Sequence, residues 1–344
     1  MHEALVRLCL LDTGRAPDTC ARSAADALAD HLARREGRPV ESPALIARNL
    51  RLAGLALPAA AQRRLDALAM REEARSTLAA EHHATLVALF DAAGIAAQPL
   101  RGWRFAELFY PDPHVRHSHA LRWLVPEPET ATRMAAILHD AGWTSRPASS
   151  LLASHKRIFA GDGRITAELH VRPFGWSSLQ LDDGQTGSSA FAAAELIGSS
   201  IVEYRRTVGR WTADLVHLLR LAMPDPAAFA AIVNRFGFVD LAHDRLDHAV
   251  RLTSPDDMAV HAAVERLRSA LVAIGHARDS RAVRDVRQLA AMRAASGSRF
   301  LLQAVRRPDL LLRGRRLRHE QHMQRALNVA GRAGLLNALR AARR

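Results

Sequence analysis

The sequence is poor in cysteine and has no long apolar run. Cys9 and Cys20 are the only cysteines, and neither has neighbours at a metal-ligand spacing, so we expect two buried, reduced thiols. No apolar segment approaches the ~18 residues typical of a membrane-spanning helix. The N-terminal segment carries an acidic Glu3 and lacks a small-residue cleavage site, which favours a short helix over a signal peptide. We therefore expect a cytoplasmic protein with no membrane span.

Lysine is almost absent, although the chain is basic. The net charge is +13, and Lys156 is the only lysine among 48 lysine and arginine residues. A basic chain of this kind makes nucleic acid a candidate partner. The charge is uneven, because residues 299–344 contain twelve arginines against only Asp309 and Glu320. We interpret this arginine-rich tail (299–344) as a solvated pair of amphipathic helices. The alternative is a surface that binds RNA, a phosphorylated ligand or an acidic partner.

Short apolar segments in the middle of the chain predict strands, at 95–100, 121–125, 155–160 and 164–171. The last two are separated by Gly161-Asp162-Gly163, which is a hairpin turn signal. A helix is predicted between the second and third strands, with Glu129 in its first turn and Gly142 at its end. The sequence before and after this block has helical periodicity.

Strands confined to one block between helical segments indicate an α+β fold, with a small mixed sheet as its core. We predict four regions. They are an N-terminal helical region (1–94), an α/β core (95–180), a C-terminal helical region (181–298) and the arginine-rich helical tail (299–344).

The α/β core carries an ordered set of short motifs. These are Leu100-Arg101-Gly102 before a predicted helix, Tyr110-Pro111-Asp112-Pro113, Arg116, the strand 120–125 and Glu168-Leu169-His170. In their order and spacing they resemble an uncharacterised nucleotidyltransferase family of the polymerase-β superfamily. The resemblance covers about residues 95–175, and it implies a nucleotidyltransferase-like fold with a nucleoside triphosphate as the ligand.

The resemblance also implies a metal site that this chain does not preserve. In the family, two aspartates one residue apart on a strand hold Mg²⁺ against phosphate, and a third carboxylate lies on a neighbouring strand. Here Ala120 and Arg122 stand at the first two positions, and Glu168 stands at the third. Alanine has no ligand atom, and the charge of arginine repels a divalent cation. We therefore expect a degenerate site without Mg²⁺-dependent nucleotidyl transfer.

The candidate site residues follow from these motifs. Glu168 and His170 stand at the catalytic positions, no residue is assigned to a metal, and the candidates for ligand binding are Arg101, Gly102, Arg104, Arg116, Arg122 and Lys156. Guanidinium groups recognise phosphate bidentately, and a glycine turn lets the backbone approach a phosphate closely. We expect Ala120, Arg122 and Glu168 to converge on one face of the sheet. We also expect Arg122 and Glu168 to form an ion pair there.

The leading hypothesis is a protein of nucleotidyltransferase fold that binds a nucleotide, another phosphorylated ligand or a partner protein. It would act as an accessory factor in a biosynthetic pathway. The first alternative is an active nucleotidyl or phosphoryl transferase with non-standard metal ligands, which would add Asp112, His114, His117 and His119 to Glu168 and His170. The second alternative is an RNA- or peptide-binding protein that uses the arginine-rich tail.

Overall fold

The structure is a computed structural model of the chain. It describes residues 2–11, 17–34, 40–116, 118, 120–125, 127–146, 156–174, 177, 179, 187–203, 208–275, 278–280, 283–284 and 287. The arginine-rich tail and its predicted helices lie outside the described residues.

A five-stranded mixed sheet lies at the centre of the chain, in the order β1-β2-β5-β4-β3. Its strands are β1 (Gln98–Pro99), β2 (Ala120–Leu124), β3 (Thr144–Arg146), β4 (Lys156–Ala160) and β5 (Thr166–His170). The central pair β2–β5 is parallel, and the other three pairs are antiparallel. The predicted α+β class and the predicted β4–β5 hairpin are confirmed. Strand β1 is shorter than predicted, and β3 was not predicted.

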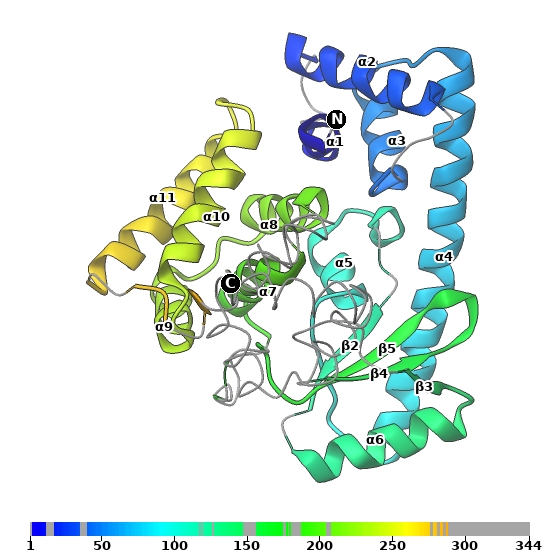
Figure 1. Ribbon diagram of the computed structural model, residues 1–344, viewed down its shortest axis with the longest axis vertical. Coiled ribbons are helices and arrows are strands. Elements are labelled where there is room, and N and C mark those ends of the chain that lie inside the picture. The colour runs from blue at the N-terminus through cyan, green and yellow to red at the C-terminus, as the bar shows by residue number, and fades with distance from the viewer. Residues whose placement is uncertain are drawn as a thin grey trace, which may run out of the picture.

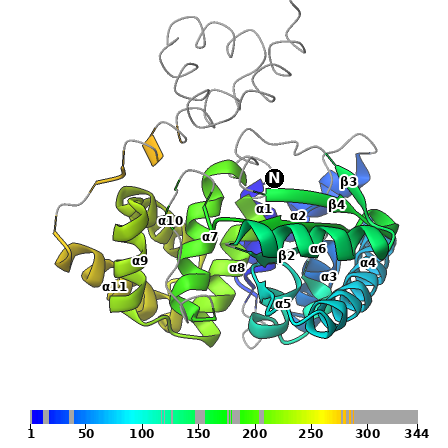
Figure 2. The same cartoon turned by 90° about the horizontal axis from the view of Figure 1, so that it is seen from below.

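One face of the sheet is apolar and packs against two helices, α4 (Ala59–Ala92) and α6 (Pro128–Asp140). Its side chains belong to one buried cluster, which includes Leu121, Trp123, Phe159, Ala167 and Leu169. Alternate residues of a strand point to opposite faces, so this cluster fixes which residues face the other way. In Figure 1 the long helix α4 runs past the strands, and Figure 2 shows α6 beside them.

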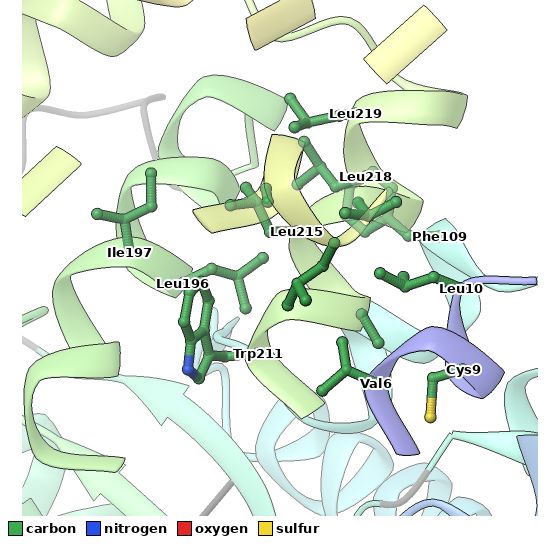
Figure 3. Close-up of a cluster of buried hydrophobic side chains, with 14 of the residues drawn as sticks. Val6, Cys9, Leu10, Phe109, Leu196, Ile197, Trp211, Leu215, Leu218 and Leu219 are labelled. Atoms are coloured by element: carbon green, nitrogen blue, oxygen red, sulfur yellow. The ribbon is translucent and has the colours of Figure 1, made fainter. Parts of the chain in front are cut away.

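The other helices precede and follow the sheet in the sequence. They are α1 (His2–Cys9), α2 (Thr19–Ala33), α3 (Pro43–Leu52), α7 (Ser189–Glu203), α8 (Val208–Leu221), α9 (Pro226–Phe236), α10 (Val239–Leu252) and α11 (Met258–Ala273). Figures 1 and 2 show α7 and α8 between the sheet and the group α9–α11. The described helices of both groups share one large core cluster. Figure 3 shows Val6 and Leu10 near Phe109 and Leu215 in this cluster.

The turn between β1 and helix α5 (Trp103–Phe109) requires glycine. Gly102 has φ +92°, a backbone conformation that residues with a side chain rarely adopt. A Cβ atom built there would lie 2.4 Å from the carbonyl oxygen of Ala120 on β2. The absence of a side chain at Gly102 therefore lets the turn lie directly against β2.

Two further predictions were tested by the described residues. Cys9 is buried, but Cys20 is exposed on α2, so the prediction of a buried thiol is wrong at Cys20. None of the helices in the described ranges combines the length and the apolar character needed to cross a bilayer.

Candidate functional site

The polar face of the sheet collects the candidate residues of β2, β4 and β5. Arg122 on β2 lies directly opposite Glu168 on β5, and Lys156 on β4 lies directly opposite His170. Residues two apart on a strand share a face, so these four side chains lie on the face opposite the apolar cluster. Ala120 shares this face by the same periodicity. The predicted convergence of Arg122 and Glu168 on one face is therefore confirmed.

Three side chains contact one oxygen of Glu168. Arg122 Nε donates to Glu168 Oε2 over 3.0 Å, and Lys156 Nζ donates to the same oxygen over 2.8 Å. His170 Nε2 lies 3.0 Å from it. The predicted ion pair between Arg122 and Glu168 is thus present, and Lys156 forms a second one. We call these four residues (Arg122, Lys156, Glu168 and His170) the sheet-face cluster.

Charge within the sheet-face cluster is unbalanced. Burial alone raises the pKa of the Glu168 carboxyl, but Arg122, the His170 hydrogen bond and Lys156 together hold this pKa well below its usual range. Burial also lowers the pKa of His170 to about 4, despite its contact with Glu168. At neutral pH, Glu168 is therefore ionised and His170 is neutral, so His170 Nε2 donates the shared hydrogen. Two cations then face one anion, which leaves a surplus of one positive charge.

The two cations of the sheet-face cluster retain access to solvent. The side chains of Arg122 and Lys156 are 14% and 18% exposed, whereas that of Glu168 is 9% exposed. Burial lowers the pKa of Lys156, and Glu168 only partly offsets this effect. Within the described residues, Arg122 donates hydrogen bonds through Nε alone. No described residue accepts a hydrogen bond from its two terminal nitrogens, and Nη1 is 3.7 Å from the position of a Cβ on Gly102.

Arg101, which precedes the glycine turn, binds helix α7. Its Nε donates to Glu195 Oε1 over 2.7 Å, and its Nη1 donates to Ser199 Oγ over 2.5 Å. The Arg101 backbone N–H also points at Glu195 Oε2, over 3.4 Å. Burial raises the pKa of Glu195, and the nearby arginines offset this only partly. A ligand that uses Arg101 must therefore compete with the carboxylate of Glu195.

Arg116 is buried and makes internal contacts on the other side of the glycine turn. It donates two hydrogen bonds of 2.7 Å to the two carboxylate oxygens of Asp214 on α8. A third, also 2.7 Å, reaches the carbonyl of Gly102. Tyr110 donates its hydroxyl hydrogen to the same Asp214 over 2.8 Å. We call Arg116, Asp214 and Tyr110 the buried triad. It ties the glycine turn and the Tyr110 loop to the C-terminal helices.

The remaining candidates lie outside both groups. Arg104 is about half exposed and pairs with Glu107 on its own helix over 3.3 Å. Asp112 accepts a hydrogen bond from the backbone N–H of His114, which is a local loop contact. His117 and His119 lie outside the described residues. Across the described ranges, no three His, Cys, Asp or Glu side chains are grouped so as to hold a metal ion. Ligand binding by Arg101, Arg104 or Arg116 stays a prediction.

Sequence reasoning missed Asp214 and Glu195, the internal partners of two candidate arginines. The sequences of helices α7 and α8 nevertheless contain a signal that these two carboxylates have internal partners. Asp214 lies between Trp211 and Leu215 on the buried face of α8, and Glu195 is the one charged residue within 189–202 of α7. A carboxylate on an apolar helix face requires a buried cation or hydrogen-bond donors.

Comparison with known proteins agrees with the resemblance drawn from the motifs. No curated protein and no solved structure is a significant match to the chain. The model of an uncharacterised nucleotidyltransferase family matches residues 42–195. The match begins just before α3 and ends within α7, so it contains the whole sheet, the sheet-face cluster and the glycine turn. Residues 42–195 are thus similar to this nucleotidyltransferase family, and they include every residue of the sheet-face cluster.

Proposed function

We propose that the domain binds a phosphate group of a nucleotide or another phosphorylated ligand and does not catalyse metal-dependent nucleotidyl transfer. In this role the protein serves as an accessory factor in a biosynthetic pathway. The observation that carries the proposal is the sheet-face cluster, in which Arg122 and Lys156 both bind Oε2 of Glu168.

The residues on this face do not fit a divalent cation. Magnesium prefers an octahedral set of oxygen ligands at about 2.0–2.1 Å. The sheet-face cluster offers one carboxylate, whose Oε2 already accepts from two cations. Ala120 supplies no donor atom, and Arg122 places a positive charge where the family pattern has an aspartate. The cations of the protein thus neutralise Glu168 in place of a metal.

The same residues suit a phosphate group. A phosphomonoester carries about −1.5 to −2 charges at pH 7 and offers several acceptor oxygens. Arg122 presents terminal N–H groups in a planar fork that matches such oxygens, and the Lys156 ammonium adds a second charge. The surplus positive charge favours an anion over a neutral ligand. Limited exposure strengthens this attraction, since partly buried charges are screened less by salt.

The test measures binding and transfer in the same preparation. We expect ATP to bind in calorimetry, and no nucleotide to be transferred from any of the four NTPs with Mg²⁺ or Mn²⁺. The matched variants are Lys156→Gln and Arg157→Gln, because these neighbours on β4 face opposite sides of the sheet. Lys156→Gln should weaken ATP binding at least fivefold, and Arg157→Gln should change it less than twofold. A nucleotidylated product that disappears in Glu168→Gln would instead establish an active transferase with non-standard ligands.

A further inference from the structure

We infer that the sheet-face cluster binds its phosphate ligand in the metal-free form, so that Mg²⁺ opposes binding. This inference rests on the proposed function, because it concerns the same ligand and the same residues. It adds the chemical state of the ligand, which is a free polyphosphate or phosphate monoester and not its magnesium complex.

The positive charge of the sheet-face cluster has a fixed place on β2 and β4. Arg122 occupies a strand position directly opposite Glu168, and Lys156 reaches the same carboxylate oxygen from the other side of β5. Both cations are held by the parallel and antiparallel ladders around β5, so they are positioned before any ligand binds. Their charge exceeds that of Glu168 by one.

Magnesium and the donors of the sheet-face cluster compete for the same phosphate oxygens. A phosphate oxygen that coordinates Mg²⁺ has lost much of its capacity to accept from an N–H donor. Of the donors on this face, the terminal nitrogens of Arg122 make no hydrogen bond to a described residue. They gain most from a phosphate whose oxygens are all available. Magnesium and Arg122 are therefore alternative partners for one phosphate group.

Magnesium also changes the charge of the ligand. Free ATP carries roughly four negative charges, and each bound Mg²⁺ cancels two of them. The complex also brings a divalent cation toward Arg122 and Lys156, which repel it. Glu168 is the one carboxylate of the sheet-face cluster, and it is already paired with both cations. The sheet-face cluster thus offers a bound Mg²⁺ no carboxylate that is not already paired. The metal complex is disfavoured both by its smaller negative charge and by repulsion of Mg²⁺ from Arg122 and Lys156.

The experiment titrates ATP and inorganic pyrophosphate into the full chain, once in EDTA and once in excess Mg²⁺. We expect binding at least tenfold weaker with Mg²⁺ in the unmodified protein and in Arg157→Gln. In Arg122→Gln, the ratio of the two dissociation constants should fall below threefold. The double variant Ala120→Asp/Arg122→Asp restores both carboxylates to β2. In that variant, Mg²⁺ should strengthen binding instead of weakening it.

Equal or tighter binding with Mg²⁺ than in EDTA, in the unmodified protein, would overturn the inference and leave the proposed function standing. A ratio that stays above tenfold in Arg122→Gln would also overturn it, because the effect would then come from the ligand and not from the cluster. Arg122→Gln keeps the test decisive if the double variant does not fold. The proposed function fails separately: a nucleotidylated product in the transfer assay would overturn it, and no binding of either probe with or without Mg²⁺ would overturn it together with the inference.

Discussion

Two arginine–carboxylate groups lie on either side of the glycine turn, and they differ in charge balance and in burial. In the buried triad, Arg116 meets Asp214 one to one with two hydrogen bonds of 2.7 Å, and both side chains are 5% exposed or less. In the sheet-face cluster, Arg122 and Lys156 share Glu168, and both cations remain partly exposed.

Under the proposed function, this difference assigns a structural role to Arg116 and a binding role to Arg122. A buried charge is tolerated when its partner and hydrogen bonds are complete, as they are for Arg116, whose third bond reaches the Gly102 carbonyl. Near the surface, positive charge that exceeds the charge of its carboxylate partner can be neutralised by an anionic ligand, as we propose for Arg122. Both arginines come from the same motif block, and both were predicted to bind the ligand. The two arginines differ in their burial and in the charge balance of their partners.

Breaking the buried triad should have the largest effect, and that effect should be on stability. Arg116→Ala leaves Asp214 buried without the cation that binds both of its carboxylate oxygens, and the hydrogen bond from Tyr110 brings no positive charge to replace it. Removing one partner of a buried pair typically costs about 3–5 kcal/mol. Arg122→Ala should cost much less, because Lys156 and His170 still contact Glu168. Urea denaturation of the two variants measures this difference. The comparison fails if Arg122→Ala destabilises the protein as much as Arg116→Ala.

The fold could be predicted from the sequence more fully than the hydrogen-bond partners of the candidate site residues. The β4–β5 hairpin was predicted because Gly161-Asp162-Gly163 separates two apolar runs. The residues of β3 are all exposed, so this strand has no buried alternation to reveal it. The β2–β5 register that places Arg122 against Glu168 was expected only through the family resemblance. The partners of Arg116 and Arg101 were missed because they lie 98 and 94 residues away in the sequence, beyond any local pattern.

Reversing one charge in the sheet-face cluster should affect binding more than removing the arginine-rich tail. In Arg122→Glu, a second carboxylate faces Glu168 and the surplus positive charge is lost, so ATP affinity should fall at least tenfold. A truncation that ends at Ser298 should reduce it less than threefold. The proposed site consists of residues on β2, β4 and β5, and salt screens the charge of exposed arginines over about 8 Å at physiological ionic strength, so we expect the tail to contribute less. Calorimetry at constant salt compares the two. Loss of binding in the truncation alone would place the ligand on the tail.

Because Lys156 is the single lysine, its NMR signal can test directly whether the anion binds at the sheet-face cluster, as we propose. Protein labelled with ¹⁵N at lysine has one Nζ signal, that of Lys156. Burial lowers the pKa of this amine below its ordinary value, and Glu168 only partly restores it. An anion binds the protonated amine better than the neutral one, so binding must raise the Lys156 pKa. ATP affinity must then fall as pH rises through the pKa of Lys156.

The decisive measurement is an NMR titration of the Lys156 Nζ signal with ATP in EDTA, repeated across pH. We predict that ATP moves the signal and raises the Lys156 pKa, and that Arg122→Glu abolishes both effects. Arg157→Gln, on the opposite face of the same strand, should preserve them. If calorimetry shows ATP binding to the unmodified protein while the Lys156 signal and its pKa stay unchanged, the ligand binds elsewhere and the account is contradicted.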